Sequence, residues 1–403
     1  EGIGKLFKKK DKKSKETQEK EHAQGENMGT SSESTSATQD SGNEPVKKSP
    51  TANTSQGMRL YSKFDFVQGE KIIAVEDFSE ISVGDFPLGW NTNSSAEVVT
   101  LDDNPEKWLF MTKDGYFQPD FVKDMPENFT LEFNAFTRYR SNNLLLYKFF
   151  IYASDNPNRD LSEKYLANAF QFNWQGCINE AAFFVAENGE EVNKNEGLNI
   201  AALTCKSENY DIPSEVKFSI WRQKSRLRIY VNETKIIDIP QAFNPKSAYN
   251  AFKFGVDYMN YSEQEDKDEF MVSNIRYAVG SPDTRSKLIT EGKLVTRGIL
   301  FDVNSDVIKP SSYGVLKEIA SALSENPQIK VKIIGHTDSD GEDKSNLALS
   351  QKRALAVKNM LSSEFKIDAS RMQTDGKGEA EPSDSNNTAI GKANNRRVEF
   401  IKL

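Results

Sequence analysis

The chain has 403 residues, which exceeds one ordinary domain and predicts at least two domains joined by a linker. Hydrophobic residues make up 37% of it and the mean hydropathy is −0.65, so we expect a sizeable segment without a packed core. The net charge of −8 argues against nucleic acid as the main partner, because no basic surface dominates. No run approaches the roughly 18 to 20 apolar residues of a membrane-spanning helix.

Residues 1–57 are of low complexity and open with the lysine-rich run KLFKKKDKKSK. Such a segment cannot bury enough apolar surface to offset its ordering entropy, so it is predicted to be a disordered tether. Its lysines either contact anionic lipid or form a solvated tail. The first residue is neither Met nor Cys, which suggests a processed form without an N-terminal lipid anchor.

Residues 58–280 show a period-two pattern, which indicates antiparallel strands with one buried face. The same pattern runs through 216–220 and 227–231, with polar turns between the strands and a further strand from Lys235. Four apolar residues mark the clearest buried face: Phe129, Leu131, Phe133 and Ala135. An all-β sandwich is the expected packing of these strands.

The hairpins of RLRIYVNETKIIDIP and the closing strand EFMVSNIRYA resemble the jelly-roll sandwiches of the concanavalin A-like and laminin G-like group. The resemblance implies a fold and a partner of protein or glycan chemistry, but no activity. A small membrane barrel is the alternative, since a barrel could place the polar face of these strands in its lumen. The two cysteines, Cys177 and Cys205, are either separate buried thiols or one disulfide of an exported protein.

Residues 281–296 are predicted to be a linker, and the pattern changes again in 297–403. A strand at 298–303, a helix from Pro310, and a buried strand at 329–336 come first. A second helix follows, and two strands close the chain. The order βαβαββ predicts an α/β domain. The core stripe of the second helix is expected to be Leu347, Ala354, Val357 and Leu361.

The loop HTDSDG and the helix after it carry the candidate binding residues. Asp338 directly follows the buried strand, and Asn346, Ser350 and Arg353 share one face of the helix because they are four and three positions apart. A carboxylate and a guanidinium across a groove suit a zwitterion with both an ammonium and a carboxylate group. The alternatives are a structural Asp–Arg ion pair and a calcium loop, although the glycine of DSDG stands too early for an EF-hand. His336 is expected to be a hydrogen-bonded structural residue.

Residues 298–403 resemble the OmpA-like peptidoglycan-binding family over the whole predicted domain. Six motifs in family order and spacing carry the resemblance: ILFDVNSDVIKP, IIGHTDSDG, NLALSQKRALAV, ASRMQTDGKGEAEP, NNT and NNRRVEF. The resemblance implies that the ligand is the diaminopimelate side chain in the stem peptide of peptidoglycan, whose free end is a zwitterion.

The family's ligand positions can be placed on this sequence one by one. Asp338 would take the ammonium group and Arg353 the carboxylate, with support from Asn346, Arg396 and Asn304. Asp340 stands where many members have Thr or a small residue. It is therefore either a second contact to the ammonium group or a solvated side chain.

Together these observations predict a non-catalytic tether of a Gram-negative envelope, located in the periplasm and associated with the outer membrane. Its expected partners are peptidoglycan and an outer-membrane protein complex; membrane contact would be indirect or peripheral. Neither a metal nor a cofactor is expected. Two alternatives remain open: a glycan-active enzyme of the cell wall, or an outer-membrane barrel with a periplasmic anchor.

Overall fold

The computed structural model describes most of the chain after its first 63 residues. The described ranges are 64–102, 104–139, 145–175, 180–203, 214–259, 268–280 and 283–403. The predicted N-terminal tether and both cysteines, Cys177 and Cys205, lie outside the described residues.

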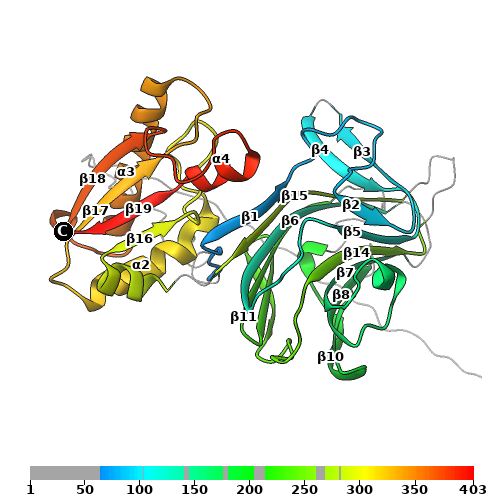
Figure 1. Ribbon diagram of the computed structural model, residues 1–403. Coiled ribbons are helices and arrows are strands. Elements are labelled where there is room, and N and C mark those ends of the chain that lie inside the picture. Colours follow the sequence, from blue (N-terminus) through cyan, green and yellow to red (C-terminus); the bar gives the residue numbers. More distant parts are fainter. Residues whose placement is uncertain are drawn as a thin grey trace, which may run out of the picture. The chain divides into compact units, whose positions relative to one another are not determined.

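Two antiparallel sheets are built from the strands that precede Gly280 (Figure 1). The first sheet has the order β13-β12-β11-β6-β15-β4-β3, and β1 also pairs with β15. Its strands are β1 (Lys71–Glu76), β3 (Ala96–Leu101), β4 (Asn104–Met111), β6 (Asn128–Arg138), β11 (Ser214–Gln223), β12 (Arg226–Val231), β13 (Thr234–Ile239) and β15 (Glu269–Val279). The second sheet has the order β10-β9-β8-β7-β14-β5-β2. Its strands are β2 (Trp90–Thr92), β5 (Gly115–Pro119), β7 (Leu146–Ala153), β8 (Asn168–Gln175), β9 (Ala181–Glu187), β10 (Glu190–Leu198) and β14 (Ala251–Asp257).

An aromatic core lies between these two sheets. The ring of Phe133 in β6 is 5.5 Å from that of Phe149 in β7 and 5.0 Å from that of Phe254 in β14, measured between centroids. The four apolar residues predicted on one face of β6 are all fully buried in this core. The β-rich middle segment is therefore confirmed, while the jelly-roll assignment stays a prediction.

Part of the polar face of β6 is also buried, which the sequence did not predict. Thr130 and Glu132 are only 1% and 3% exposed. Gln68 Nε2 donates a hydrogen bond to Glu132 Oε1 at 2.7 Å, and the Gly69 amide donates to Thr130 Oγ1 at 3.0 Å. The segment before β1 thus covers this face and satisfies its polar groups, as burial requires.

A third sheet and three helices form the α/β part of the chain. The sheet has the order β16-β19-β17-β18, in which only β17 and β18 are parallel. Its strands are β16 (Lys293–Thr296), β17 (Val331–His336), β18 (Met372–Gly378) and β19 (Val398–Lys402), and its helices are α2 (Tyr313–Glu325), α3 (Asp343–Ser363) and α4 (Ala389–Asn395). Among the described helices, none is long and apolar enough to cross a membrane.

Two details of the predicted order βαβαββ are wrong. The expected strand at 298–303 forms only one bridge, between Phe301 and Ile308, because a turn with Asn304 at φ 51° reverses the chain there. β16, inside the predicted linker 281–296, fills the edge of the sheet instead. The predicted order also contains no helix between its last two strands, where the structure has α4.

α3 packs unusually close to the sheet because two glycines face it. A Cβ atom at Gly335 of β17 would lie 2.3 Å from the Ser350 carbonyl oxygen, and one at Gly376 of β18 would lie 2.4 Å from the Gln351 amide nitrogen. Asn346 and Ser350 therefore occupy the buried side of the first two turns. Leu347, predicted in the core stripe, is 43% exposed, whereas the other three stripe residues are fully buried.

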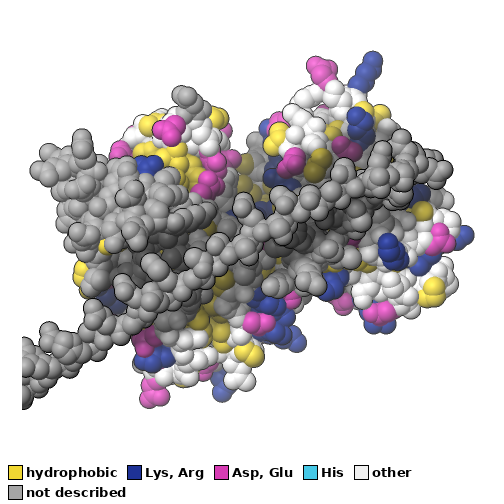
Figure 2. Space-filling model, turned by 180° about the vertical axis from the view of Figure 1, so that it is seen from behind, with side chains coloured by type: hydrophobic (Ala, Val, Ile, Leu, Met, Phe, Trp, Pro, Cys, Tyr) yellow, Lys and Arg dark blue, Asp and Glu magenta, His cyan; other side chains and the backbone are white. Residues whose placement is uncertain are grey.

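Acidic and basic side chains are interspersed on the face of the described residues seen in Figure 2. No single sign of charge dominates the visible part of that face. This mixture agrees with the modest net charge of the chain.

Candidate functional site

Asp338 lies in the loop directly after β17, where the sequence predicted it. The preceding residue fixes this loop to β18, since the Thr337 amide donates to the Gly378 carbonyl oxygen at 2.9 Å. Asp338 is 7% exposed, and its Oδ1 accepts the Asp340 amide at 3.2 Å. Arg396 donates from Nη1 to Asp338 Oδ2, so the two form an ion pair.

Asn346, in the first turn of α3, holds the same loop from the other side. Its Nδ2 donates to the carbonyl oxygens of Asp338 and Asp340 at 3.3 and 3.1 Å and to Glu379 Oε2 at 2.5 Å. Glu379 was not predicted as a site residue, although it lies within the motif ASRMQTDGKGEAEP that carries the resemblance. The buried amide therefore fixes the position of the Asp338 loop.

The side chain of Arg353 extends from α3 to the turn that follows Phe301. Its Nε donates to the Ser305 carbonyl oxygen at 3.0 Å, its Nη2 donates to that of Asp302 at 3.4 Å, and its guanidinium lies 4.9 Å from the centroid of the Phe301 ring. Burial is the largest influence on this side chain and lowers the pKa of Arg353 from its usual value. Within the described part of the chain, no hydrogen bond uses Nη1.

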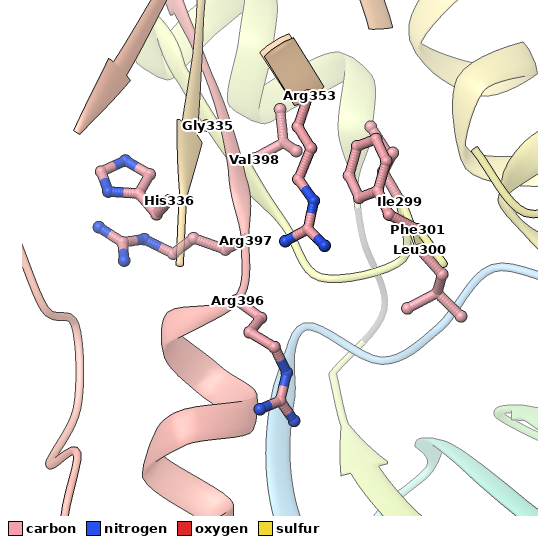
Figure 3. A pocket seen from close by; sticks show the side chains of 9 residues that line it. All are labelled: Ile299, Leu300, Phe301, Gly335, His336, Arg353, Arg396, Arg397 and Val398. Atoms are coloured by element: carbon pink, nitrogen blue, oxygen red, sulfur yellow. The ribbon is translucent and has the colours of Figure 1, made fainter. Parts of the chain in front are cut away.

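The alternative of a structural ion pair between Asp338 and Arg353 is not what the structure shows. Asp338 pairs with Arg396, whereas Arg353 is held by backbone carbonyls. In Figure 3, Arg353 enters from α3 beside the Phe301 ring. One guanidinium edge is thus positioned without a carboxylate partner among the described residues.

A pocket of about 110 Å³ is lined by Arg353 and Arg396 but not by Asp338 or Asn346. Its lining residues come from the segment after β16, the end of β17, α3 and the start of β19: Ile299, Leu300, Phe301, Gly335, His336, Arg353, Arg396, Arg397 and Val398. Three arginines line this small pocket, but Arg396 is paired with Asp338 and Arg397 with Glu399. Arg353 has no carboxylate partner among the described residues, and its guanidinium favours an anionic group.

The remaining predicted residues, Asn304 and Asp340, do not line this pocket. Asn304 is exposed in the turn that Arg353 reaches, and its backbone conformation places the flanking carbonyls of Asp302 and Ser305 toward the guanidinium. Asp340 Oδ1 accepts a hydrogen bond from Lys392 Nζ at 2.7 Å. This hydrogen bond raises the pKa of Lys392. Lys392 was not among the residues predicted from the sequence.

The Asn-Asn pair before Arg396 orders the loop that precedes α4. Asn395 Oδ1 accepts the amides of Ser383 and Asp384 at 2.8 and 2.9 Å, and its Nδ2 donates to the Asp384 carbonyl oxygen at 2.9 Å. Because Asn395 is fully buried, these bonds fix the chain one residue before the Arg396 side chain.

His336 is fully buried at the end of β17, but the expected hydrogen bond is not there. Neither ring nitrogen has a hydrogen-bond partner among the described residues, and Nε2 lies 3.6 Å from Glu399 Oε1. Arg397 extends toward the ring in Figure 3. Burial, and after it the charge of Arg397, lower the pKa of His336 to about 4.

This histidine should make the fold sensitive to mild acid. The unfolded chain takes up the His336 proton near pH 6.5, whereas the folded chain does so only near pH 4, so stability falls as the pH falls between these values. The maximum slope is about 1.4 kcal/mol per pH unit. Denaturant unfolding followed by far-UV circular dichroism should show this loss between pH 6.5 and 5. The variant His336→Gln should lose most of the slope, and an unchanged slope would contradict the assignment.

Within the described ranges, no group of three or more His, Cys, Asp or Glu residues could hold a metal ion. The DSDG loop, considered above as a calcium loop, forms no such group among the described residues. The site is a small pocket lined by three arginines, two of which pair with the buried carboxylates of Asp338 and Glu399.

Comparison with known proteins gives a match over the residues of this site. The model of the OmpA family matches residues 300–396, which span the Arg353 turn, the Asp338 loop and Arg396.

The C-terminal part of this chain is an OmpA family domain.

Relatives of the OmpA family domain are proteins of the bacterial envelope. The probable lipoprotein YiaD of Escherichia coli is 46% identical over 102 residues, which cover 25% of this chain and 46% of that protein. The outer membrane porin F of Pseudomonas fluorescens is 43% identical over 101 residues, covering 25% of this chain and 31% of the porin. The chain thus spans less than half the length of these curated relatives.

A crystal structure of the peptidoglycan-associated lipoprotein from Burkholderia pseudomallei is 30% identical over 26% of this chain and 88% of that chain, with a TM-score of 0.25. The two sheets before Gly280 lie outside the residues that the family model matches.

Proposed function

We propose that the OmpA family domain binds peptidoglycan without covalent chemistry and tethers the chain to the cell wall. The ligand is the free end of diaminopimelate, a zwitterion. Arg353 binds its carboxylate and Asp338 its ammonium group, while Asn346 holds the Asp338 loop in place. The observation that carries the proposal is the Nη1 edge of Arg353, which makes no hydrogen bond within the described residues. It lies at a pocket also lined by Arg396, the ion-pair partner of Asp338.

Charge and size both support this ligand. The pocket of about 110 Å³ suits the end of an amino-acid side chain rather than a sugar ring. Arg353 is already oriented by two carbonyl oxygens, so little further ordering is needed when a carboxylate arrives. Arg396, which is half exposed, can share its donors between Asp338 and the same carboxylate.

Affinity for one stem peptide is expected to be modest, because the ligand is small and its contacts are few. A micromolar constant corresponds to about −8 kcal/mol and would be generous here. The wall offers many sites on one polymer, so a high effective concentration retains the protein. We propose that the chain works in the periplasm, next to the outer membrane, and presents its two β-sheets to a protein or glycan partner.

Co-sedimentation with two kinds of purified peptidoglycan tests the proposal. The full chain should pellet with peptidoglycan whose stem peptides contain diaminopimelate. It should stay largely in the supernatant when lysine replaces diaminopimelate, because lysine keeps the ammonium group and lacks the carboxylate that Arg353 binds. Equal pelleting with both walls would contradict recognition of the zwitterion.

A further inference from the structure

The geometry points to a second binding site, for a neutral pyranose oligosaccharide, on the outer face of the second sheet. The site is a groove of about 480 Å³ over β7, β8 and β9, on the side of the sheet that faces away from the core. This proposal goes beyond wall binding by the OmpA family domain and does not depend on it.

The register of the three strands creates the groove. Phe150, Gln171 and Phe184 lie side by side across β7, β8 and β9. In the next row, Tyr152 is followed by Ala169 and Ala186. Ala169 is buried in the same apolar cluster as Leu166 of the loop, whereas Ala186 is partly exposed and lines the groove. The floor of the groove is therefore set by a change from large to small side chains across one sheet face.

One wall of the groove is a loop fixed by a buried lysine. Lys253 of β14 is fully buried, and its Nζ donates to the carbonyl oxygens of Asp160, Leu161 and Glu163 at 3.2, 2.8 and 2.7 Å. The ammonium group also lies 4.4 Å from the centroid of the Tyr116 ring. A loop held in this way is positioned before any ligand arrives, which lowers the cost of binding.

That loop carries Tyr165, whose side chain is 95% exposed and borders the groove. Phe184 provides a second, half-buried ring from the sheet. Flat rings on two sides of a groove suit the C–H face of a pyranose, which is apolar while its rim carries hydroxyl groups.

Two amide side chains provide the polar groups. Gln171 Nε2 donates to Asn173 Oδ1 at 2.8 Å, and within the described residues no hydrogen bond uses Gln171 Oε1 or Asn173 Nδ2. The groove thus offers one acceptor and one donor, which match a ring of hydroxyl groups. A lipid chain would leave both amide atoms unsatisfied, at a cost in free energy.

The charges at the rim argue against a charged ligand. Two charged side chains line the groove, Lys164 and Glu191. Lys164 Nζ lies 3.3 Å from Asp257 Oδ2, and Glu191 Oε1 lies 3.3 Å from Lys194 Nζ, so both are already paired. A peptide adding as a strand would need a free sheet edge. This groove lies on the face of β8, which pairs with β7 and β9 on its two sides.

Titration calorimetry of the full chain with chitotetraose, cellotetraose and maltotetraose tests the inference. At least one of these should bind saturably below about 10 mM, in the range of weak small-ligand sites. Tyr165→Ala and Asn173→Ala should each weaken that binding by about tenfold, and Tyr165→Phe should retain most of it. Leu88→Ala, which removes another fully exposed apolar side chain, should change nothing.

Preference among the sugars identifies the source of the ligand. Binding of chitotetraose alone would indicate an N-acetylated backbone such as that of the wall, and binding of the other two would indicate a different glycan. Because these probes carry no peptide, their result is independent of the Arg353 site. No binding of any probe, or binding that survives Tyr165→Ala, would overturn the inference.

Discussion

Gly335→Ala should destabilise the OmpA family domain by about 3 kcal/mol, because α3 leaves no room for a side chain on β17. The added Cβ would lie 2.3 Å from the Ser350 carbonyl oxygen, which belongs to the helix backbone and cannot rotate away. The helix would have to move outward as a unit. Since α3 carries Asn346 and Arg353, wall binding should weaken together with stability.

The four tryptophans allow this effect to be assigned to one part of the chain. Trp90, Trp108 and Trp174 pack within the two β-sheets, whereas Trp221 of β11 belongs to the same apolar cluster as Leu316 of α2. Tryptophan fluorescence therefore reports mainly on the two β-sheets. Far-UV circular dichroism at the helix band reports mainly on α2, α3 and α4. In denaturant, Gly335→Ala should lower the midpoint of the dichroism transition.

Gly89→Ala is the matched control for Gly335→Ala. A Cβ atom at Gly89 would meet only Phe121 Cδ1, at an ordinary 3.8 Å, so stability should change by no more than about 0.5 kcal/mol. A Gly335→Ala variant with the stability of the parent would show that α3 does not pack as closely as described.

Arg353→Ala should weaken binding to a soluble diaminopimelate muropeptide by about 10- to 100-fold, the loss expected for charge-assisted hydrogen bonds to a carboxylate. Arg353→Lys should recover only part of the affinity, because an ammonium group cannot bridge the Ser305 carbonyl and the ligand in the same planar geometry. Equilibrium binding monitored by calorimetry or fluorescence anisotropy measures both.

Lys352→Ala is the control for the loss of charge. Lys352 is the neighbouring residue on α3, is exposed and carries the same charge, but lies outside the Arg353 pocket. The Lys352→Ala variant should bind the muropeptide like the parent protein. If Lys352→Ala weakened binding as much as Arg353→Ala, the effect would come from net charge rather than from a positioned guanidinium.

Much of this architecture could be predicted from the sequence because the spacing of apolar and polar residues indicates which side chains are buried. The period-two run from Phe129 predicted the buried face of β6, and the change to helical spacing near Leu316 predicted α2. The burial of Glu132 could not be predicted, since its cover comes from Gln68, 64 residues away. Alternation within one strand contains no information about such distant contacts.

The candidate site was predicted in part, and the missed residues share a physical reason. Asp338 and Arg353 could be found because the strand end and the helical spacing singled them out, and a resemblance then assigned their roles. Glu379 and Lys392 could not, because each acts through one contact between distant segments, to Asn346 and to Asp340. Leu347 was misplaced because the glycines of β17 and β18 admit Asn346 and Ser350, rather than leucine, at the closest approach of α3.

The most direct test of the central claim is a four-way binding measurement. The parent protein and Arg353→Ala are each titrated with a diaminopimelate muropeptide and with the same muropeptide amidated at the distal carboxylate. If Arg353 binds that carboxylate, amidation weakens binding to the parent by at least about tenfold and has little further effect on the variant. If amidation weakens both proteins equally, Arg353 does not contact the carboxylate and the proposed recognition of the zwitterion is wrong.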